Sequence, residues 1–253
     1  MVKNKRKTVV VTGGTRGIGL AIVRAFHAQG YTVIVGARTE TSEIKKLGAR
    51  VFFKCADVRR QEDHRKLVTA CMDLTGRLDA YINCAGVSLW KSLQDVDDDF
   101  LNMLIDTNLK GVLWGSQAAS NALKKDGCII NVSSLAGKRG SAYNSVYCAT
   151  KFGVNGITQS LAKELGPRGI RVNSVCPVYI KTKSVVDALQ EPLSPAAGKS
   201  VEDYLNKFAR ENSALKRLPT AEEVASVCLF LASQGASAIT GQCINIDCGV
   251  LPQ

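Results

Sequence analysis

The chain has 253 residues, of which 45% are hydrophobic and 22% are charged, and its excess of lysine and arginine gives a formal net charge of +11. This length suits one large domain or two small ones, and the composition is that of an ordinary globular protein. No apolar run approaches the roughly 18 residues of a membrane span, and the run after the basic N-terminus stops at Thr12, too early for a signal-peptide core. We expect a cytoplasmic protein without a membrane partner.

Short apolar runs alternate with helical patterns along the chain. The expected strands are 8–13, 32–37, 50–55, 78–83, 128–133, 170–175 and 243–247, and the expected helices are 17–29, 61–75, 97–122, 145–166 and 221–232. Continuous apolar strands are typical of a sheet covered on both faces. The alternation predicts a single α/β domain over 1–253, a Rossmann-type doubly wound parallel sheet of about seven strands with helices on both faces.

One segment interrupts this rhythm. Residues 183–219 contain "EPLSPAAGKS", with two prolines and several small residues. Long irregular segments in compact domains are usually functional. We interpret 183–219 as a helical lid over a substrate site.

A glycine-rich turn, "VTGGTRGIG", joins the first expected strand to the first expected helix. Gly13, Gly17 and Gly19 allow a tight turn and a close approach of backbone N–H groups to a phosphate at a helix N-terminus. Since the stretch follows a strand and opens a helix, it predicts a dinucleotide site. The alternative is a glycine turn without a ligand.

The end of the second expected strand bears on which dinucleotide binds. An acid there usually holds the ribose 2′-hydroxyl of NAD, whereas arginine accommodates the 2′-phosphate of NADP. This chain has Arg38 at that place and Arg16 in the glycine turn. Two guanidinium groups suit a phosphate, so the sequence favours NADP(H) unless both are simply solvated loop charges.

Two tyrosines are each followed four residues later by a lysine. Tyr147 and Lys151 would lie on one face of a helix, where the ammonium would favour the phenolate and lower the tyrosine pKa toward the range of a useful general acid. Tyr179 and Lys183 have the same spacing but follow Pro177 without a helical pattern. The spacing alone does not choose between them.

The sequence gives less support to nucleic-acid binding, disulfide bonds or a metal site. The positive charge suggests nucleic acid, but the cations are scattered and no binding motif accompanies them, so an anionic cofactor or substrate explains them better. Nine cysteines fall mostly within apolar segments, which fits reduced, buried thiols. His27 and His64 are the only histidines and there is no CxxC, so we expect no metal site.

Taken together, the motifs resemble the short-chain dehydrogenase/reductase family, and among its members the 3-oxoacyl-[acyl-carrier-protein] reductases. The resemblance covers essentially the whole chain. The matching segments, in the family's order, are TGGTRGIG (12–19), DV (57–58), NCAG (83–86), TNLKG (107–111), INVSSLAG (130–137) and YCATK (147–151). The family's catalytic serine precedes its tyrosine across a loop, and Ser134 has this relation to Tyr147 but no serine has it to Tyr179.

The resemblance implies a role for each matching residue. Tyr147 exchanges a proton with the substrate, Lys151 lowers its pKa and binds the nicotinamide ribose, Ser134 holds the carbonyl oxygen, and Asn108 supports a proton-relay water. The implied cofactor contacts are Gly13, Thr15, Arg16, Gly17, Ile18, Gly19, Arg38, Asp57, Val58, Asn83, Ala85, Gly86, Tyr147, Lys151, Pro177, Ile180 and Thr182. The expected substrate contacts are Ser134, Asn144, Val178 and Tyr179.

The expected activity is NADPH-dependent hydride transfer to a ketone, or the reverse reaction on a secondary alcohol. The resemblance favours a 3-oxoacyl thioester or a related secondary-metabolite ketone, carried by CoA or a carrier protein, and a homotetramer or homodimer. Basic residues at Lys124, Lys125 and Arg168 would suit an acidic carrier, or are plain surface charges. Polar residues such as Lys138 and Arg139 keep a cyclic or sugar-derived alcohol open as substrate, and an idle NADP-binding regulatory protein is a further alternative.

Overall fold

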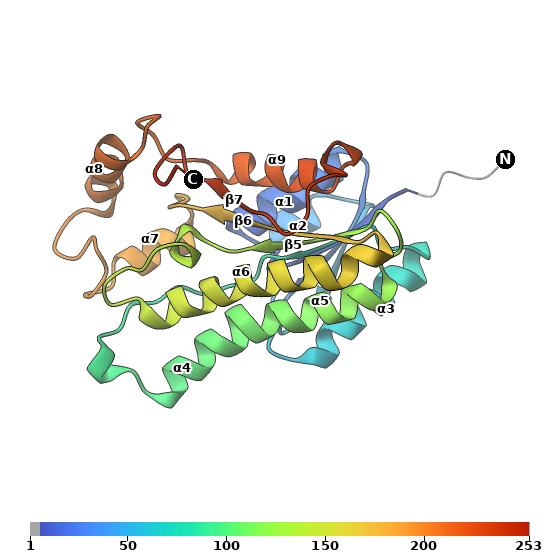
Figure 1. Cartoon of the computed structure of the whole chain (residues 1–253), viewed down its shortest axis with the longest axis horizontal. Helices are drawn as coiled ribbons and strands as arrows, with labels where there is room; N and C mark the ends of the chain where they lie inside the picture. Colours follow the sequence, from blue (N-terminus) through green and yellow to red (C-terminus); the bar gives the residue numbers. More distant parts are fainter. Residues whose placement is uncertain (1–5, 253) are drawn as a thin grey trace.

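Valine- and isoleucine-rich runs form a sheet of seven parallel strands in the computed structural model, which describes residues 6–252 (Figure 1). Residues 1–5 and 253 of the expected domain lie outside the described part. The order across the sheet is β3-β2-β1-β4-β5-β6-β7. The strands are β1 (Thr8–Thr12), β2 (Thr32–Ala37), β3 (Val51–Cys55), β4 (Ala80–Asn83), β5 (Cys128–Val132), β6 (Arg171–Pro177) and β7 (Cys243–Ile246). The predicted doubly wound parallel sheet is confirmed.

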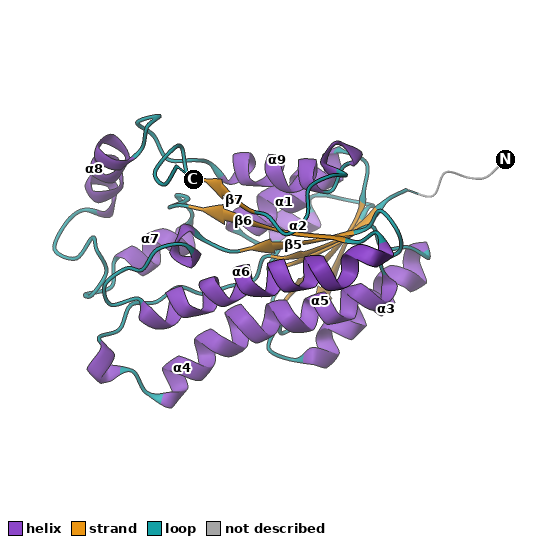
Figure 2. Cartoon of the chain, in the orientation of Figure 1, coloured by secondary structure: helices purple, strands orange, loops and turns teal. Residues whose placement is uncertain are grey.

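Helices cover both faces of this sheet (Figure 2). They are α1 (Gly17–Ala28), α2 (Ser42–Lys45), α3 (Gln61–Thr75), α4 (Asp98–Ile105), α5 (Gly111–Ala122), α6 (Ser145–Leu165), α7 (Lys183–Leu189), α8 (Val201–Asn212) and α9 (Ala221–Leu231). Successive strand residues point to opposite faces, so Val9 and Val11 pack in the core beneath α1 and α9, while Val10 packs in the core beneath α3, α5 and α6. The short helix α2 was not expected.

The strand order reverses between β1 and β4, which both pair with their neighbours in parallel. At such a reversal the loops leaving the two strands diverge, and ligands of open α/β sheets bind in the crevice between them. In this chain the glycine turn leaves β1 and the segment 84–87 leaves β4. The fold therefore brings the predicted cofactor motifs to one end of the sheet.

The expected helix 97–122 is not continuous. A π-helical turn at Asp106–Lys110 separates α4 from α5 and contains the fully buried Asn108. Such a turn holds one more residue than an α-helical turn, and it is frequent at functional sites. The turn aims Asn108 inward at a point where a regular helix would present a different residue.

Residues 183–219 contain α7 and α8, so the helical character predicted for this segment is confirmed. They share a small apolar core that is separate from the two cores of the sheet. Its buried members are Leu189, Ala196 and Leu205, with Trp90, Tyr179, Val185, Val201, Tyr204 and Leu218 packed around them. Figure 1 shows α8 standing apart from the sheet, connected to the body by long loops.

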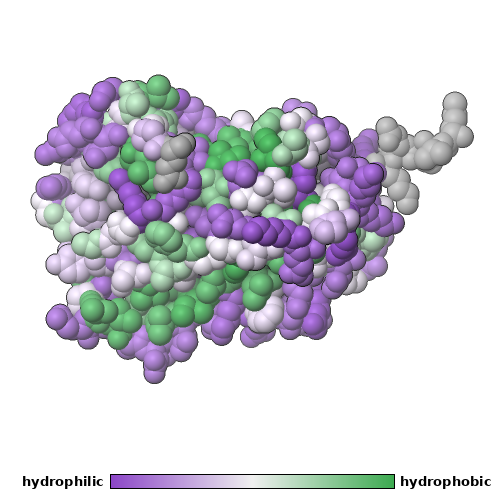
Figure 3. Space-filling model, in the orientation of Figure 1, coloured by the Kyte–Doolittle hydropathy of each residue, from purple (hydrophilic) through white to green (hydrophobic). Residues whose placement is uncertain are grey.

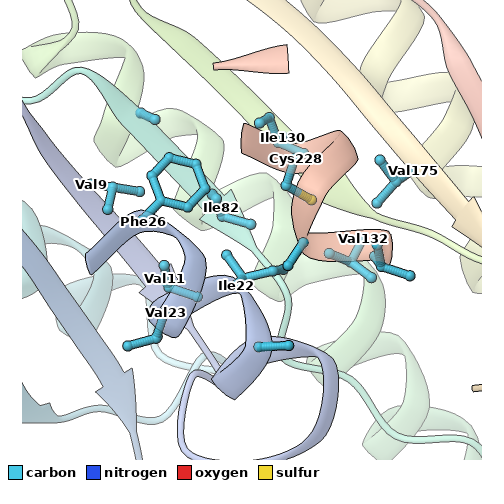
Figure 4. Packing of buried hydrophobic residues seen from close by; sticks show 14 of the residues in the cluster. Val9, Val11, Ile22, Val23, Phe26, Ile82, Ile130, Val132, Val175 and Cys228 are labelled. Carbon is cyan, nitrogen blue, oxygen red and sulfur yellow. The ribbon is translucent and has the colours of Figure 1, made fainter. Parts of the chain in front are cut away.

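The side chain of Phe26 packs α1 onto the core of the sheet, so replacing it measures how much this core contributes to stability. It is fully buried in the same cluster as Ile22 and Cys228 (Figure 4). We expect Phe26→Ala to lower the free energy of unfolding by about 3–5 kcal/mol, because it removes apolar contacts and leaves a cavity. Urea denaturation measures the change. Phe230→Ala, at a residue 46% exposed on α9, should cost no more than about 1 kcal/mol, and equal costs for the two variants would contradict this view of the core.

Candidate active site

The glycine turn after β1 has no room for side chains. Gly13 has a φ of +67°, and a Cβ atom there would lie 2.8 Å from the Ala85 Cα. A Cβ on Gly19 would lie 2.2 Å from the Gly13 carbonyl oxygen. The start of α1 has neither a capping side chain nor an acidic residue in its first turn. The turn therefore offers unsatisfied N–H groups and partial positive charge, which fit the pyrophosphate of a dinucleotide.

Neighbouring segments close around this turn. Thr182 approaches from the segment after β6, where its Cγ2 would lie 3.2 Å from a Cβ built on Gly17. The Thr41 hydroxyl donates to the Thr15 carbonyl. Ile18 packs on the core beneath α1, and Ile180 is buried in that same core. The segment Pro177–Thr182 thus reaches the glycine turn, as the predicted cofactor set requires.

Arginines surround the end of β2. Arg16 and Arg38 are both exposed, the first at the N-terminus of α1 and the second just beyond β2. A hydrogen bond from Arg59 is the main cause that lowers the pKa of Asp57, and the Arg38 charge adds to it. Asp57 is thus a paired carboxylate with its oxygens 2.5–3.0 Å from the Arg59 guanidinium. Val58 follows it and accepts a hydrogen bond from the His64 ring at its carbonyl.

The segment after β4 is fixed by Thr12, whose hydroxyl accepts from the Cys84 backbone N–H at 3.1 Å. Ala85 and Gly86 then continue toward the glycine turn and Lys151. The side chain of Asn83 points elsewhere, since its amide donates to Asn131 and Ser116 inside the sheet–helix core. The NCAG motif predicts that Asn83 contacts the cofactor. Because its side chain is buried in the core, only its backbone could make that contact.

The four residues predicted to be catalytic come together from three segments. Lys151 is 5% exposed and its ammonium donates to the Val132 carbonyl at 2.8 Å, at the end of β5. The Asn108 amide exchanges two hydrogen bonds with the Val87 backbone, at 2.8 and 2.9 Å. A Cβ on Gly86 would lie within 3.7 Å of both the Lys151 ammonium and the Asn108 carbonyl oxygen. These contacts hold the two side chains against one backbone segment.

Tyr147 lies one turn before Lys151 on α6. The ammonium of Lys151 is 5.7 Å from the centre of the Tyr147 ring. Ser134, just after β5, accepts a hydrogen bond from the Ala136 N–H, and its hydroxyl is near enough to Tyr147 to lower the pKa of the phenol. The tyrosine therefore has a hydroxyl neighbour on one side and a buried cation on the other.

Burial dominates the protonation of this group. It raises the pKa of Tyr147 to about 12, against a lowering by the Ser134 hydrogen bond, and it lowers the pKa of Lys151 to about 8. The sequence predicted the opposite direction for the tyrosine. The difference has a physical cause. Burial destabilises the phenolate by more free energy than the neighbouring groups restore, and the ammonium of Lys151 donates to the Val132 carbonyl.

Three of the expected substrate residues lie on the segments before α6 and after β6. Asn144 precedes α6, is 5% exposed, and has no hydrogen-bond partner for its side-chain carbonyl. Val178 and Tyr179 follow β6, and both are half-buried. Tyr179 lies within electrostatic reach of Tyr147 and Arg139, and burial strongly raises its pKa. The second tyrosine–lysine pair is not a functional unit, because exposed Lys183 forms an ion pair with Asp187.

Two residues near the site were missed from the sequence. Tyr204 and Phe208 lie one turn apart on α8, and Tyr179 packs edge-on against both rings, with centroids 5.9 and 5.0 Å away. The hydroxyl groups of Tyr179 and Tyr204 are 3.2 Å apart. Their i, i+4 spacing indicates two aromatic rings on one helix face. Nothing in the sequence indicates that this face packs against the segment after β6.

Several basic residues have structural roles. Lys138 donates to the Cys243 carbonyl at 2.6 Å, and Arg168 donates to the Ser120 carbonyl at the end of α5. Within residues 6–252, no group of three or more His, Cys, Asp and Glu side chains is placed to hold a metal ion. In the same range, no helix has the length and apolar character needed to span a bilayer.

Comparisons with known proteins agree with this geometry. The family model described as "Enoyl-(Acyl carrier protein) reductase" matches residues 13–251. A putative ketoacyl reductase of monensin polyketide synthase from Streptomyces virginiae is 37% identical over 99% of both chains. Two solved structures superpose closely: an actinorhodin polyketide ketoreductase variant with NADPH (29% identity, 99% of both chains, TM-score 0.88) and a ligand-free aldohexose dehydrogenase of Thermoplasma acidophilum (28%, 98% of both chains, 0.87).

The chain belongs to the short-chain dehydrogenase/reductase family, and the resemblance to its 3-oxoacyl-carrier-protein reductase-like members is confirmed. At this level it is an oxidoreductase related to ketoreductases, and a nicotinamide dinucleotide is the cofactor that fits its glycine turn.

The lowered pKa of Lys151 predicts a pH-dependent contribution to stability. Between pH 8 and pH 10.5 the folded chain has lost the Lys151 proton while the unfolded chain retains it, so this residue makes stability rise with pH. The unfolding free energy of the wild type should therefore gain roughly 2–3 kcal/mol over Lys151→Met across that window. Urea titrations measure the difference. Lys163→Met, at an exposed position of the same helix, should show no such trend, and a constant Lys151 difference would refute the assignment.

Proposed function

We propose that this chain is an NADPH-dependent ketoreductase that uses Tyr147 as its general acid. The observation that carries the proposal is the grouping of Tyr147, Ser134 and the buried Lys151 beside the segment after β4, at the end of the sheet where the glycine turn lies. This arrangement supplies a proton donor, a hydrogen-bond donor for a carbonyl oxygen, and a nearby positive charge. A dinucleotide bound at the turn would supply the hydride.

The protein's residues handle the proton and the developing charge. With its pKa raised to about 12, Tyr147 keeps its proton at neutral pH and can donate it to an alkoxide. The Ser134 hydroxyl would hold the carbonyl oxygen, where a hydrogen bond aimed at developing negative charge is most effective. With its pKa lowered to about 8, Lys151 can exchange protons near neutral pH, and Asn108 fixes the adjacent Val87 backbone.

Arg16 and Arg38 support the choice of NADPH over NADH. Both are exposed beside the turn, and neither forms an ion pair among the described residues. A 2′-phosphate could be bound by both guanidinium groups. The ketoreductase structure with TM-score 0.88 contains NADPH, which is consistent with this choice.

The substrate we favour is a 3-oxoacyl thioester or a related polyketide-type ketone, since a relative is named as a ketoacyl reductase. Helices α7 and α8 would act as its lid, with Asn144, Val178 and Tyr179 as contacts. A polar cyclic or sugar-derived alcohol is a second candidate, because an aldohexose dehydrogenase superposes equally well and Asn144 offers an unpaired acceptor. An idle NADP-binding protein is disfavoured by the presence of all four catalytic side chains.

The basic residues expected to bind a carrier protein lie far from Tyr147 of the same chain. Arg168 follows the end of α6, whereas Tyr147 lies near its start, and the 18 helical steps from Tyr147 to Leu165 span about 27 Å. Lys124, Lys125 and Arg168 therefore lie at the N-terminal ends of β5 and β6, the end of the strands opposite to Tyr147 of the same chain. A carrier delivering a substrate to Tyr147 from these residues would have to reach the site of another copy.

A homotetramer or homodimer would bring such copies together. Leu113 on α5, Phe152 on α6 and Phe230 on α9 are 40%, 48% and 46% exposed. Figure 3 shows apolar residues gathered over α5 and α6. Exposed apolar side chains on two helix layers favour self-association through both.

Replacing the proposed acid tests the function directly. Tyr147→Phe should lower kcat for reduction of a 3-oxoacyl thioester with NADPH by about 10²–10⁴-fold, because it removes the proton donor and little else. NADPH binding, measured by fluorescence, should persist. Tyr31→Phe, at a tyrosine 8% exposed beside β2, is the matched control and should keep the parental kcat. Parental turnover in Tyr147→Phe would refute the mechanism, whereas tight NADPH binding without turnover on any ketone by the wild type would favour the idle protein.

Removing one guanidinium tests the cofactor. Arg38→Leu should lower kcat/KM for NADPH by about 10- to 100-fold, the loss of a charge-assisted hydrogen bond, while kcat/KM for NADH changes little. Steady-state kinetics with both cofactors measures the ratio. Arg65→Leu, an exposed arginine on α3, should leave the ratio unaltered, and an equal loss for both cofactors in Arg38→Leu would contradict a phosphate contact.

A further inference from the structure

A groove lies between the lid helix α8 and the start of α9, outside the proposed active site. Its volume is about 510 Å³, within the range of small-molecule pockets. Asn108, Ser134, Tyr147 and Lys151 do not line it, and Ile180 is its one residue from the proposed cofactor set.

The floor of the groove is apolar. Leu218 and Ala221 line it and are half-buried, so both present apolar surface, and the nearly buried Ile180, Leu205 and Ala209 lie behind them. Leu218 packs on the small core of the lid, and Ala221 packs on the core beneath α1 and α9. A ligand lying on these residues would therefore contact the lid and the body of the domain at once.

Cations gather in the walls of the groove. Lys181 is paired with Glu202, and Arg217 is paired with Glu223 through two hydrogen bonds of 2.7 and 2.8 Å. Together with Arg210 and Lys216, they make four basic lining residues against two acidic ones.

Of the four basic residues that line the groove, Arg210 and Lys216 form no ion pair with an acid within residues 6–252. The Lys216 ammonium donates to the Arg210 backbone carbonyl at 3.1 Å, which places it at the C-terminal end of α8 beside Arg210, and it keeps two further hydrogens for a ligand. The acidic lining residues are Glu202, used by Lys181, and Glu222 in the first turn of α9. Cationic walls over an apolar floor complement a molecule with an anionic head and an apolar chain.

We propose that this groove binds an amphiphilic anion, a carboxylate or phosphate carrying a short hydrocarbon chain. Arg210 and Lys216 hold the headgroup, and the chain covers Leu218 and Ala221. Bound there, the ligand fixes α8 against the segment after β6 and so stabilises one position of the lid. This site is separate from the reaction centre, and its occupancy does not depend on the proposed reductase activity.

Calorimetric titration of the full chain without cofactor tests the proposal, with octanoate, octyl phosphate, octanol and acetate as probes. Saturable binding of octanoate or octyl phosphate is expected, and the tighter of the two identifies the preferred headgroup. Octanol and acetate each lack one half of the recognised chemistry, so both should bind at least about tenfold more weakly, a difference of about 1.4 kcal/mol.

Variants locate the site. Arg210→Gln combined with Lys216→Gln should weaken octanoate binding by about tenfold or more, and Glu222→Gln should strengthen it, because a like charge is removed. Lys207→Gln is the matched control, since Lys207 is exposed on the same helix but does not line the groove. Circular dichroism confirms folding of each variant. Absence of saturable binding to the wild type, unchanged affinity in the double variant, or equal affinity for octanol would overturn the proposal.

Discussion

The burial of the Lys151 ammonium is the constraint on which the rest of the site depends. A cation that is 5% exposed needs a partner, and the Val132 carbonyl at the end of β5 provides it at 2.8 Å. This bond attaches α6 to the C-terminal end of β5, and the Ser133 hydroxyl adds a second hydrogen bond, to the Lys151 backbone carbonyl. Because Tyr147 lies one turn away on the same helix, its position relative to Ser134 follows from the same attachment.

Much of the fold was predictable because it rests on local patterns. Runs such as "TVVVT" can be covered only between helix layers, and glycines of the first turn match positions where a Cβ would collide with Ala85 or Gly13. The catalytic residues were predictable through their motif order. The side-chain direction of Asn83 was not, because its hydrogen bonds to Asn131 and Ser116 join segments distant in sequence.

The direction of the tyrosine pKa shows where sequence reasoning stops. Helical spacing correctly placed a lysine beside the phenol, with its ammonium 5.7 Å from the ring centre. Spacing carries no information about burial, however, and desolvation is the larger effect on both groups. The aromatic contacts of Tyr179 with Tyr204 and Phe208 were missed for a similar reason, since they join a strand end to a helix of the irregular segment.

The π-helical turn at Asp106–Lys110 makes the site sensitive to chain length as well as to side-chain chemistry. Each residue of an α-helix advances the chain by about 100° around its axis. Loss of one residue here would allow α4 and α5 to merge into one regular helix and would rotate α4 by about that angle relative to α5. Asn108 would then leave the Val87 backbone, although every motif residue could still be present in the sequence.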